Sequence, residues 1–304
     1  MDGQELESYI EAGKIAKQIK DYARDIIKPG MKLLDIARMV DDKIIELGGE
    51  LGFPVNLSID EIAAHYTPEP GDDRIVEGLL KFDVGVTING YFADTAFSVD
   101  FSEDGKYKDI IHANEAMLEN VMKKVYSKME IMEIGEAASD VLEEWNEKNG
   151  TKYNLINSLS GHQVAQNIMH AGFSIPNYRN KDKRIIDETG FASESFITTG
   201  GGEIKSGLGG GIYKIDDWNK KPRDRDSREV LEYIKENFKT RPFCMRWLER
   251  EGFKKLRFIF SDLKKQGIFY EYPLLIETSG GPVSQMENTF VSGNGKVICT
   301  TRDD

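Results

Sequence analysis

The sequence predicts a mixed α+β fold, in which antiparallel strands and helices alternate along a chain of 304 residues. A strong hairpin signal joins two apolar strands over 81–100, and amphipathic helical patterns flank it on both sides. A block of helical patterns at 227–266 then interrupts a strand-rich second half. We interpret this block as an inserted helical subdomain within a single domain spanning 1–304, a length that one large core can organise.

Apolar residues that recur every three to five positions predict the helices of the first half. The pattern favours helices over 4–27, 34–47, 106–128 and 134–149. Lys28-Pro29-Gly30 ends the first of them, since proline and glycine interrupt helices. Phe53-Pro54-Val55 predicts a short edge strand, because a strand that contains proline is tolerated at the edge of a sheet.

The second half predicts strands and turns around the helical block. A charged connector at 214–226 precedes helices expected at 227–239, 241–251 and 256–266, and strands are expected near 269–277, 282–291 and 296–301. The glycine runs 200–202 and 209–211 are expected to form flexible turns. They do not fit a phosphate-binding loop, because Ile204 stands where that motif needs glycine.

Composition narrows the classes of function. The formal net charge is −12, so nucleic-acid binding has no global electrostatic support. The acidic N-terminal stretch lacks the apolar core of a signal peptide, and no apolar run approaches the roughly 18 residues of a membrane span. Cys244 and Cys299 match no metal or redox spacing. We therefore expect a cytoplasmic protein with reduced thiols and no membrane partner.

Two aspartates occupy predictable positions in the 81–100 hairpin. Asn89-Gly90 favours a two-residue type I′ turn, because both residues tolerate positive φ. Gly85 then lies opposite Asp94, and Asp83 shares a face with Gly85. Asp83 and Asp94 become diagonal neighbours roughly 7–8 Å apart at the backbone. No side chain at Gly85 fills the space between them.

Two carboxylates within apolar strands are costly unless a positive group meets them. Diagonal carboxylates could serve two divalent ions about 3.5–4 Å apart. Alternatively, one or both could face water or an arginine, and a bulge in either strand would change the register. The hairpin alone leaves these possibilities open.

Further candidate ligands follow along the chain. His162 and His170 would share a face on one strand, or lie about 80° apart on a helix. His65 lies among small apolar residues, where an isolated histidine is usually half-buried and satisfied. Glu194 and Glu287 are acids inside strand patterns. One set is rich in oxygen ligands with a single nitrogen, which suits Mn, Fe, Co or Zn: Asp83, Asp94, His162, Glu194 and Glu287.

The order of these five residues resembles the ligand pattern of the methionine aminopeptidases, within the creatinase-like, pita-bread metallopeptidases. Similar segments surround them: GFPVNLSIDEIAAHYTP, KFDVGVTINGYFADTAFSV, SGH followed by HAG, QMENT, YIEAGKIA and PFCMRWL. The long gap between Glu194 and Glu287 resembles the helical insertion of type II members, and the short N-terminal lead resembles the archaeal form. The resemblance covers nearly the whole chain. It implies a pseudo-symmetric pita-bread fold, with a curved antiparallel sheet covered by helices.

The resemblance also implies a site and a reaction. Asp83 would be the bidentate ligand of one metal, Asp94 and Glu287 would bridge, and His162 and Glu194 would complete the second metal. His65 would lie beside the substrate amine and scissile amide, and His170 would polarise the carbonyl. Phe53, Met169 and Phe196 would line the methionine pocket. The implied reaction removes the N-terminal initiator methionine from nascent proteins and peptides, using a water activated by two divalent ions (Co, Mn, Fe or Zn) with Glu194 as general base.

Several positions depart from the family pattern without removing a ligand: Ala165, Asn167, Ser193, Ser195, Met286 and Asn288. They bear on pocket fit and metal preference, since groups around the ligands tune a metal. The family implies a monomer. A ribosome contact would need a local basic patch, for which 181–184 and 220–223 are candidates.

Two other functions are weighed against the peptidase. A non-catalytic binding protein on the same fold would be expected to lack ligands, whereas all five positions are filled. A proline-specific peptidase of the superfamily normally carries an additional N-terminal domain, and here the first hairpin ligand is already Asp83.

Overall fold

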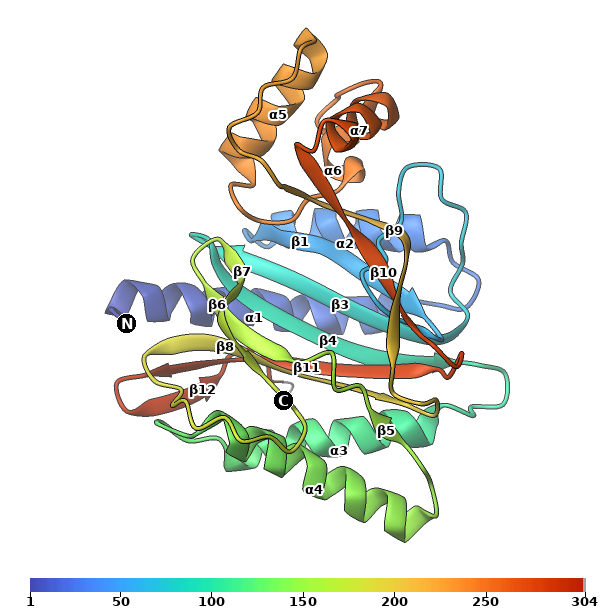
Figure 1. Cartoon of the computed structure of the whole chain (residues 1–304), viewed down its shortest axis with the longest axis vertical. Coiled ribbons are helices and arrows are strands. Elements are labelled where there is room, and N and C mark those ends of the chain that lie inside the picture. Colours follow the sequence, from blue (N-terminus) through green and yellow to red (C-terminus); the bar gives the residue numbers. More distant parts are fainter. Residues whose placement is uncertain (303–304) are drawn as a thin grey trace.

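A computed structural model describes residues 1–302, which form a curved antiparallel sheet with helices on one face (Figure 1). The helices are α1 (Gly3–Ile26), α2 (Leu33–Glu46), α3 (Lys108–Lys124), α4 (Ile131–Asn149), α5 (Arg225–Asn237), α6 (Met245–Arg250) and α7 (Leu256–Lys265). The strands of the first half are β1 (Glu50–Ile59), β2 (Ile62–Ala64), β3 (Gly78–Ile88), β4 (Tyr91–Phe101) and β5 (Asn154–Leu155). The remaining strands are β6 (Gly161–Ala165), β7 (Ile168–Ile175), β8 (Thr189–Thr198), β9 (Ile204–Ile215), β10 (Phe269–Glu277), β11 (Val283–Gly293) and β12 (Lys296–Cys299).

The main sheet has the strand order β1-β3-β4-β11-β8-β6-β7, with β12 paired to β11 and β5 paired to β8. All of its pairings are antiparallel. Strand β11 comes late in the chain but lies in the middle of the sheet, between β4 and β8 (Figure 1). The predicted edge position of Pro54 is confirmed, although its strand is longer than expected.

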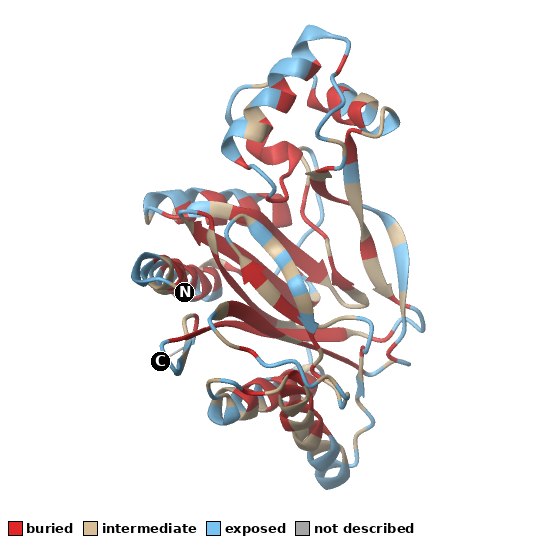
Figure 2. Cartoon of the chain, turned by 60° about the vertical axis from the view of Figure 1, so that its left-hand side comes forward, coloured by how far each residue is buried: buried red, intermediate tan, exposed pale blue. Residues whose placement is uncertain are grey.

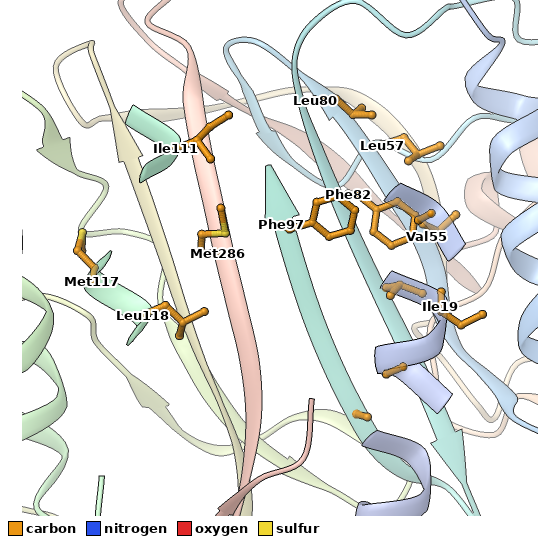
Figure 3. Packing of buried hydrophobic residues seen from close by; sticks show 14 of the residues in the cluster. Ile19, Val55, Leu57, Leu80, Phe82, Phe97, Ile111, Met117, Leu118 and Met286 are labelled. Carbon is orange, nitrogen blue, oxygen red and sulfur yellow. The ribbon is translucent and has the colours of Figure 1, made fainter. Parts of the chain in front are cut away.

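Two pairs of helices cover one face of this sheet. The α1–α2 pair packs on β1, β3 and β4, and the α3–α4 pair packs on β8 and β11. Figure 3 shows Ile19 of α1 beside Phe82, while Leu118 of α3 lies beside Met286 of β11. Buried side chains join both halves in one core, and exposed residues lie on the outer faces of the helices (Figure 2).

The β3–β4 hairpin has the predicted register. Gly85 pairs with Asp94, and Asp83 pairs with Ala96. The turn residues Asn89 and Gly90 have φ of 54° and 81°, as a type I′ turn requires. No bulge interrupts the pairing from Gly78 to Ile88, so both aspartates reach the same face of the sheet.

A second, three-stranded sheet with the order β2-β10-β9 carries the three helices α5–α7 between its strands β9 and β10. These helices form their own buried cluster around Trp247, Phe243 and Phe260. Helices were expected here, but α6 begins at Met245 rather than at 241, because Phe243 bridges to Tyr213 of β9 and Cys244 has an extended backbone. The interpretation of 227–266 as a separate subdomain stays a prediction. Within residues 1–302, no helix is both long and apolar enough to cross a membrane.

The expectation of a flexible turn at 209–211 is wrong, because these glycines lie inside β9. The reason is close approach of two backbones. The Gly210 carbonyl accepts a hydrogen bond from the Thr67 N–H at 2.9 Å, and a side chain at Gly210 would collide with the carbonyl oxygen of His65. Glycine serves here to let β9 pack against the segment that carries His65.

Candidate metal centre

Five neighbouring strands of the main sheet each contribute one potential metal ligand. In sheet order these are Asp83 on β3, Asp94 on β4, Glu287 on β11, Glu194 on β8 and His162 on β6. Glu287 pairs directly with Glu194, and on its other side with Ala96 of β4. The centre therefore lies across the middle of the sheet, on the face away from α1 and α3.

The ligand atoms form two groups that share one residue. Oxygen and nitrogen atoms of Asp94, His162 and Glu287 lie within 4.8 Å of one another, as do oxygens of Asp83, Glu194 and Glu287. His162 Nε2 is 3.5 Å from Asp94 Oδ2 and 3.9 Å from Glu287 Oε1. Glu194 belongs to the group with Asp83 and Glu287, and the assignment of Glu194 and His162 to one metal, which the resemblance implied, stays a prediction. Each group could hold a divalent ion, and Glu287 belongs to both.

Without a nearby cation, burial disfavours the ionised form of the four carboxylates. Desolvation raises the pKa of Asp83 to about 7. It also raises the pKa values of Asp94, Glu194 and Glu287 well above their usual range, and the neighbouring carboxylates add to this effect. Desolvation lowers the pKa of His162 to about 4, so its imidazole is neutral and can offer a lone pair.

The polar atoms of the centre fit divalent cations. Asp83 Oδ1, Asp94 Oδ1 and both carboxylate oxygens of Glu287 are buried without a hydrogen-bond partner among the described residues. Buried oxygens are normally satisfied, so these four mark a place for positive charge. Carboxylate oxygens with one imidazole form a donor set suited to Mn, Fe, Co or Zn. The residues present therefore fit the metal ions expected from the sequence.

A bulge in β1 places Phe53 over the hairpin glycine. Phe53 pairs with Gly85 and Asn56 pairs with Asp83, so β1 has one residue more than β3 between these two pairs. A Cβ added at Gly85 would overlap the Phe53 ring. The space that we expected to be unfilled between the two aspartates is therefore next to an aromatic ring, and Gly85 makes room for it.

A cavity of about 250 Å³ opens beside the centre. Asp83, Asp94, His162, Glu194 and Glu287 line one part of it. Its other lining residues are mainly apolar, and they include the three residues expected to hold methionine, Phe53, Met169 and Phe196, together with Leu159, Ile212, Tyr272 and Leu275. The cavity therefore brings apolar side chains together with the ligand-rich set.

His65 and His170 also line the cavity. His170 lies on β7, and its ring centroid is 4.3 Å from that of His162 with the planes nearly perpendicular. The single strand or helix considered for 156–172 is replaced by a β6–β7 hairpin that turns at Asn167, whose φ is 58°. Burial lowers the pKa of His65, and it lowers the pKa of His170 to about 3, so both rings are neutral.

Gln285 is a site residue that the sequence analysis missed. Its Nε2 donates to Asp83 Oδ2 at 3.2 Å and to Glu194 Oε1 at 2.8 Å. These bonds orient two of the carboxylates. The signal was present, since Gln285 and Glu287 are two positions apart on one strand and must share a face.

The departures from the family pattern lie away from the ligand atoms. Asn288 and Met286 alternate with Glu287 and point to the helical face, where Asn288 contacts Lys20, Thr301 and Met122. Ser193 and Ser195 flank Glu194 in the same way and hydrogen-bond to Asn177 and Asn114. Ala165 pairs with Ile168 near the tip of the β6–β7 hairpin, next to Asn167. The alternation of strands thus separates the changes at 193, 195, 286 and 288 from the centre.

Comparison with known proteins agrees with this geometry. Residues 7–271 match the model of metallopeptidase family M24. A methionine aminopeptidase from Thermococcus kodakarensis is 41% identical over 98% of this chain and 99% of its own length. One from Methanocaldococcus jannaschii is 38% identical over 98% and 100%. Methionine aminopeptidase 2 of Candida albicans is 33% identical over 98% of this chain and 70% of its own length.

Solved structures confirm the pita-bread fold class at low sequence identity. A thermophilic Arx1 superimposes with a TM-score of 0.82 at 16% identity, covering all of this chain and 92% of the other. Methionine aminopeptidase from Thermotoga maritima gives a TM-score of 0.67 at 17% identity, covering 100% and 98%. The matches in sequence extend over almost the entire chain, and the resemblance noted in the sequence is confirmed: this chain belongs to metallopeptidase family M24.

Proposed function

We propose that this protein hydrolyses the peptide bond after an N-terminal methionine in peptides and nascent chains, with divalent metal ions bound at the candidate centre. The observation that carries the proposal is the convergence of five ligand-type side chains, with Glu287 common to both groups, beside a cavity that has an apolar region. The full-length similarity to methionine aminopeptidases gives the reaction class.

We assign Asp83, Asp94, His162, Glu194 and Glu287 as the residues that hold two ions. Bound ions would make a water acidic enough to act as nucleophile near neutral pH and would polarise the scissile carbonyl. Glu194 is the proposed general base, since desolvation and its carboxylate neighbours hold its pKa well above the usual range. Gln285 would keep the Glu194 carboxylate oriented through its 2.8 Å hydrogen bond.

His65 and His170 would contact the substrate. His65 Nδ1 lies 3.1 Å from the Pro273 carbonyl, which can only accept, so this nitrogen carries the proton. Its Nε2 then presents a lone pair and can accept a hydrogen bond from the substrate amine or amide N–H. His170, neutral and next to His162, is the proposed donor to the carbonyl oxygen as negative charge develops there.

The apolar region of the cavity is proposed to hold the methionine side chain. Phe53, Met169 and Phe196 line it, and flexible thioether chains pack well against aromatic rings and methionine. A charged N-terminal side chain would be left without a partner against these residues, which favours methionine over lysine or glutamate.

The test is the release of free methionine from Met-Gly and Met-Ala peptides. Metal-stripped protein should be inactive, and Mn, Co, Fe or Zn should restore release. Asp94→Asn should abolish it, whereas the matched Asp104→Asn, on an exposed residue beyond β4, should retain it. Folded protein that releases no methionine with any metal would contradict the proposal and favour a non-catalytic binding role. Preferential cleavage before proline would favour a proline-specific peptidase of the same superfamily.

Several further properties stay predictions. These are the identity of the ions, the monomeric state and the cytoplasmic location. The two basic segments considered for a ribosome contact offer little free positive charge, because Arg184 pairs with Asp182 and Lys220 pairs with Asp217.

A further inference from the structure

We propose that Asn56 is a positioning residue, whose carboxamide holds the backbone of His65 in the conformation that presents the imidazole to the cavity. The inference rests on the proposed function, since it gives His65 a substrate to meet. Asn56 lies on β1 and lines the cavity, yet it belongs to neither group of ligand atoms.

His65 adopts a backbone conformation that histidine rarely takes. Its φ is 69°, in the left-handed region where a Cβ crowds the neighbouring carbonyl. A residue stays in this region only when its surroundings fix it. The segment on either side is pinned. Before His65, Ala64 pairs with Leu275 of β10. After it, the Tyr66 carbonyl accepts a hydrogen bond from Leu57 N–H at 2.8 Å, and Thr67 N–H donates to the Gly210 carbonyl at 2.9 Å.

Asn56 supplies the contact at His65 itself. The His65 backbone N–H donates to Asn56 Oδ1 at 2.8 Å, and Asn56 Nδ2 donates to the Pro54 carbonyl at 3.2 Å. Asn56 is buried, with 4% of its surface exposed, so water does not easily replace this acceptor. The His65 ring is held from the other side by the Pro273 carbonyl. Backbone and ring are thus fixed by separate partners.

The β1 bulge explains why an asparagine reaches this position. Residues three apart on a regular strand face opposite ways, but the extra residue brings Phe53 and Asn56 to the same side. Asn56 pairs across the strands with Asp83, while its side-chain hydrogen bonds go to the backbone of Pro54 and His65. The polar side chain therefore stabilises the position of His65 rather than adding a ligand.

A double-mutant cycle tests the inference. Asn56→Ala should lower kcat/KM for a Met-Ala peptide about tenfold, the effect of losing one well-formed buried hydrogen bond. In a His65→Ala background, the same change should lower it less than twofold, because there is no imidazole left to position. Equal losses in the two backgrounds would overturn the proposal. Asn56→Ser replaces Asn56→Ala if the latter does not fold.

The matched control is Ser58→Ala, two positions further along β1. Ser58 is fully buried and its Oγ has no hydrogen-bond partner among the described residues, so its truncation should leave kcat/KM unchanged. The number of metal ions bound should be equal in Asn56→Ala and wild type. A loss of bound metal in Asn56→Ala would place the effect at Asp83 and would contradict a role through His65.

A structural readout keeps this test separate from the proposed function. Crystal structures of Asn56→Ala and Ser58→Ala should show the His65 ring displaced from the Pro273 carbonyl only in the former. An unmoved His65 in Asn56→Ala would overturn the inference even if the wild-type enzyme is active. If wild type releases no methionine, the proposed function fails, and displacement of His65 still decides the role of Asn56.

Discussion

Gly85→Ala would disturb the centre by the smallest possible change, one methyl group. The added Cβ would stand 2.3 Å from two carbons of the Phe53 ring, whereas carbon atoms in contact are about 3.5–4.0 Å apart. The ring must therefore retreat by about 1 Å or the β1 bulge must shift. Overpacking of this kind costs about 1–3 kcal/mol of unfolding free energy. Since Phe53 lines the cavity, KM for methionine peptides should rise as well.

Urea unfolding and steady-state kinetics measure the two effects of Gly85→Ala. Gly3→Ala is the control, because no heavy atom lies within 4 Å of a Cβ added there. In a Phe53→Ala background, Gly85→Ala should cost less stability than it does in the wild-type background, since the clashing ring is absent. If Gly85→Ala matched wild type in both stability and KM, the reasoning that Gly85 exists to accommodate Phe53 would be refuted.

Three further results are expected. Asp83→Asn should stabilise the metal-free protein at pH 7.5. The pKa of Asp83 is about 7 in the folded protein and 3.8 ordinarily, so wild type loses stability as the pH rises from about 4 to about 7 and the buried carboxyl group must ionise. Arg246→Ala should lower the unfolding free energy by about 3–5 kcal/mol in urea titrations, because Asp41 would be left as a buried unpaired charge. Asn288→His should leave kcat/KM unchanged, because residue 288 points to the helical face, but should lower the melting temperature by disturbing contacts with Lys20.

Each of these expectations has a result that would contradict it. If the melting temperatures of metal-free wild type and Asp83→Asn depended on pH in the same way, desolvation of the Asp83 carboxylate would not explain the stability. Arg38→Ala is the control for Arg246→Ala: its exposed pair with Glu249 should contribute at most about 1 kcal/mol. Equal losses for the two arginines would show that burial is not decisive. A change in kcat/KM for Asn288→His would mean that the helical face affects the ligands.

The hairpin and its two aspartates could be predicted from sequence because the information is local. Asn89-Gly90 fixes the turn, the turn fixes the register, and alternation then places Asp83 and Asp94 on one face. The other candidate ligands, His162, Glu194 and Glu287, were predicted from the order of the ligands and from the neighbouring motifs. The turn signal and each motif lie within a few residues of the chain, whereas the ligand order spans 83–287.

Non-local geometry could not be predicted in the same way. Nothing near Gly210 shows that its backbone will pass against His65, so its glycines were interpreted as a turn. The β6–β7 hairpin was missed because Gln166-Asn167 is a weaker turn signal than Asn-Gly. The helices α5–α7 were predicted from their periodicity, whereas the contact of Arg246 with Asp41 of α2 depends on the tertiary fold.

The central position of β11 has a consequence for how the protein folds. The strands β3–β4 pair early along the chain and can supply Asp83 and Asp94, while β6 and β8 can supply His162 and Glu194. These two halves of the main sheet are joined by β11, which brings Glu287. Because such distant segments must close large loops before they pair, this step is expected late in folding. Binding of a pair of ions would then report that β11 has been inserted and the sheet is complete.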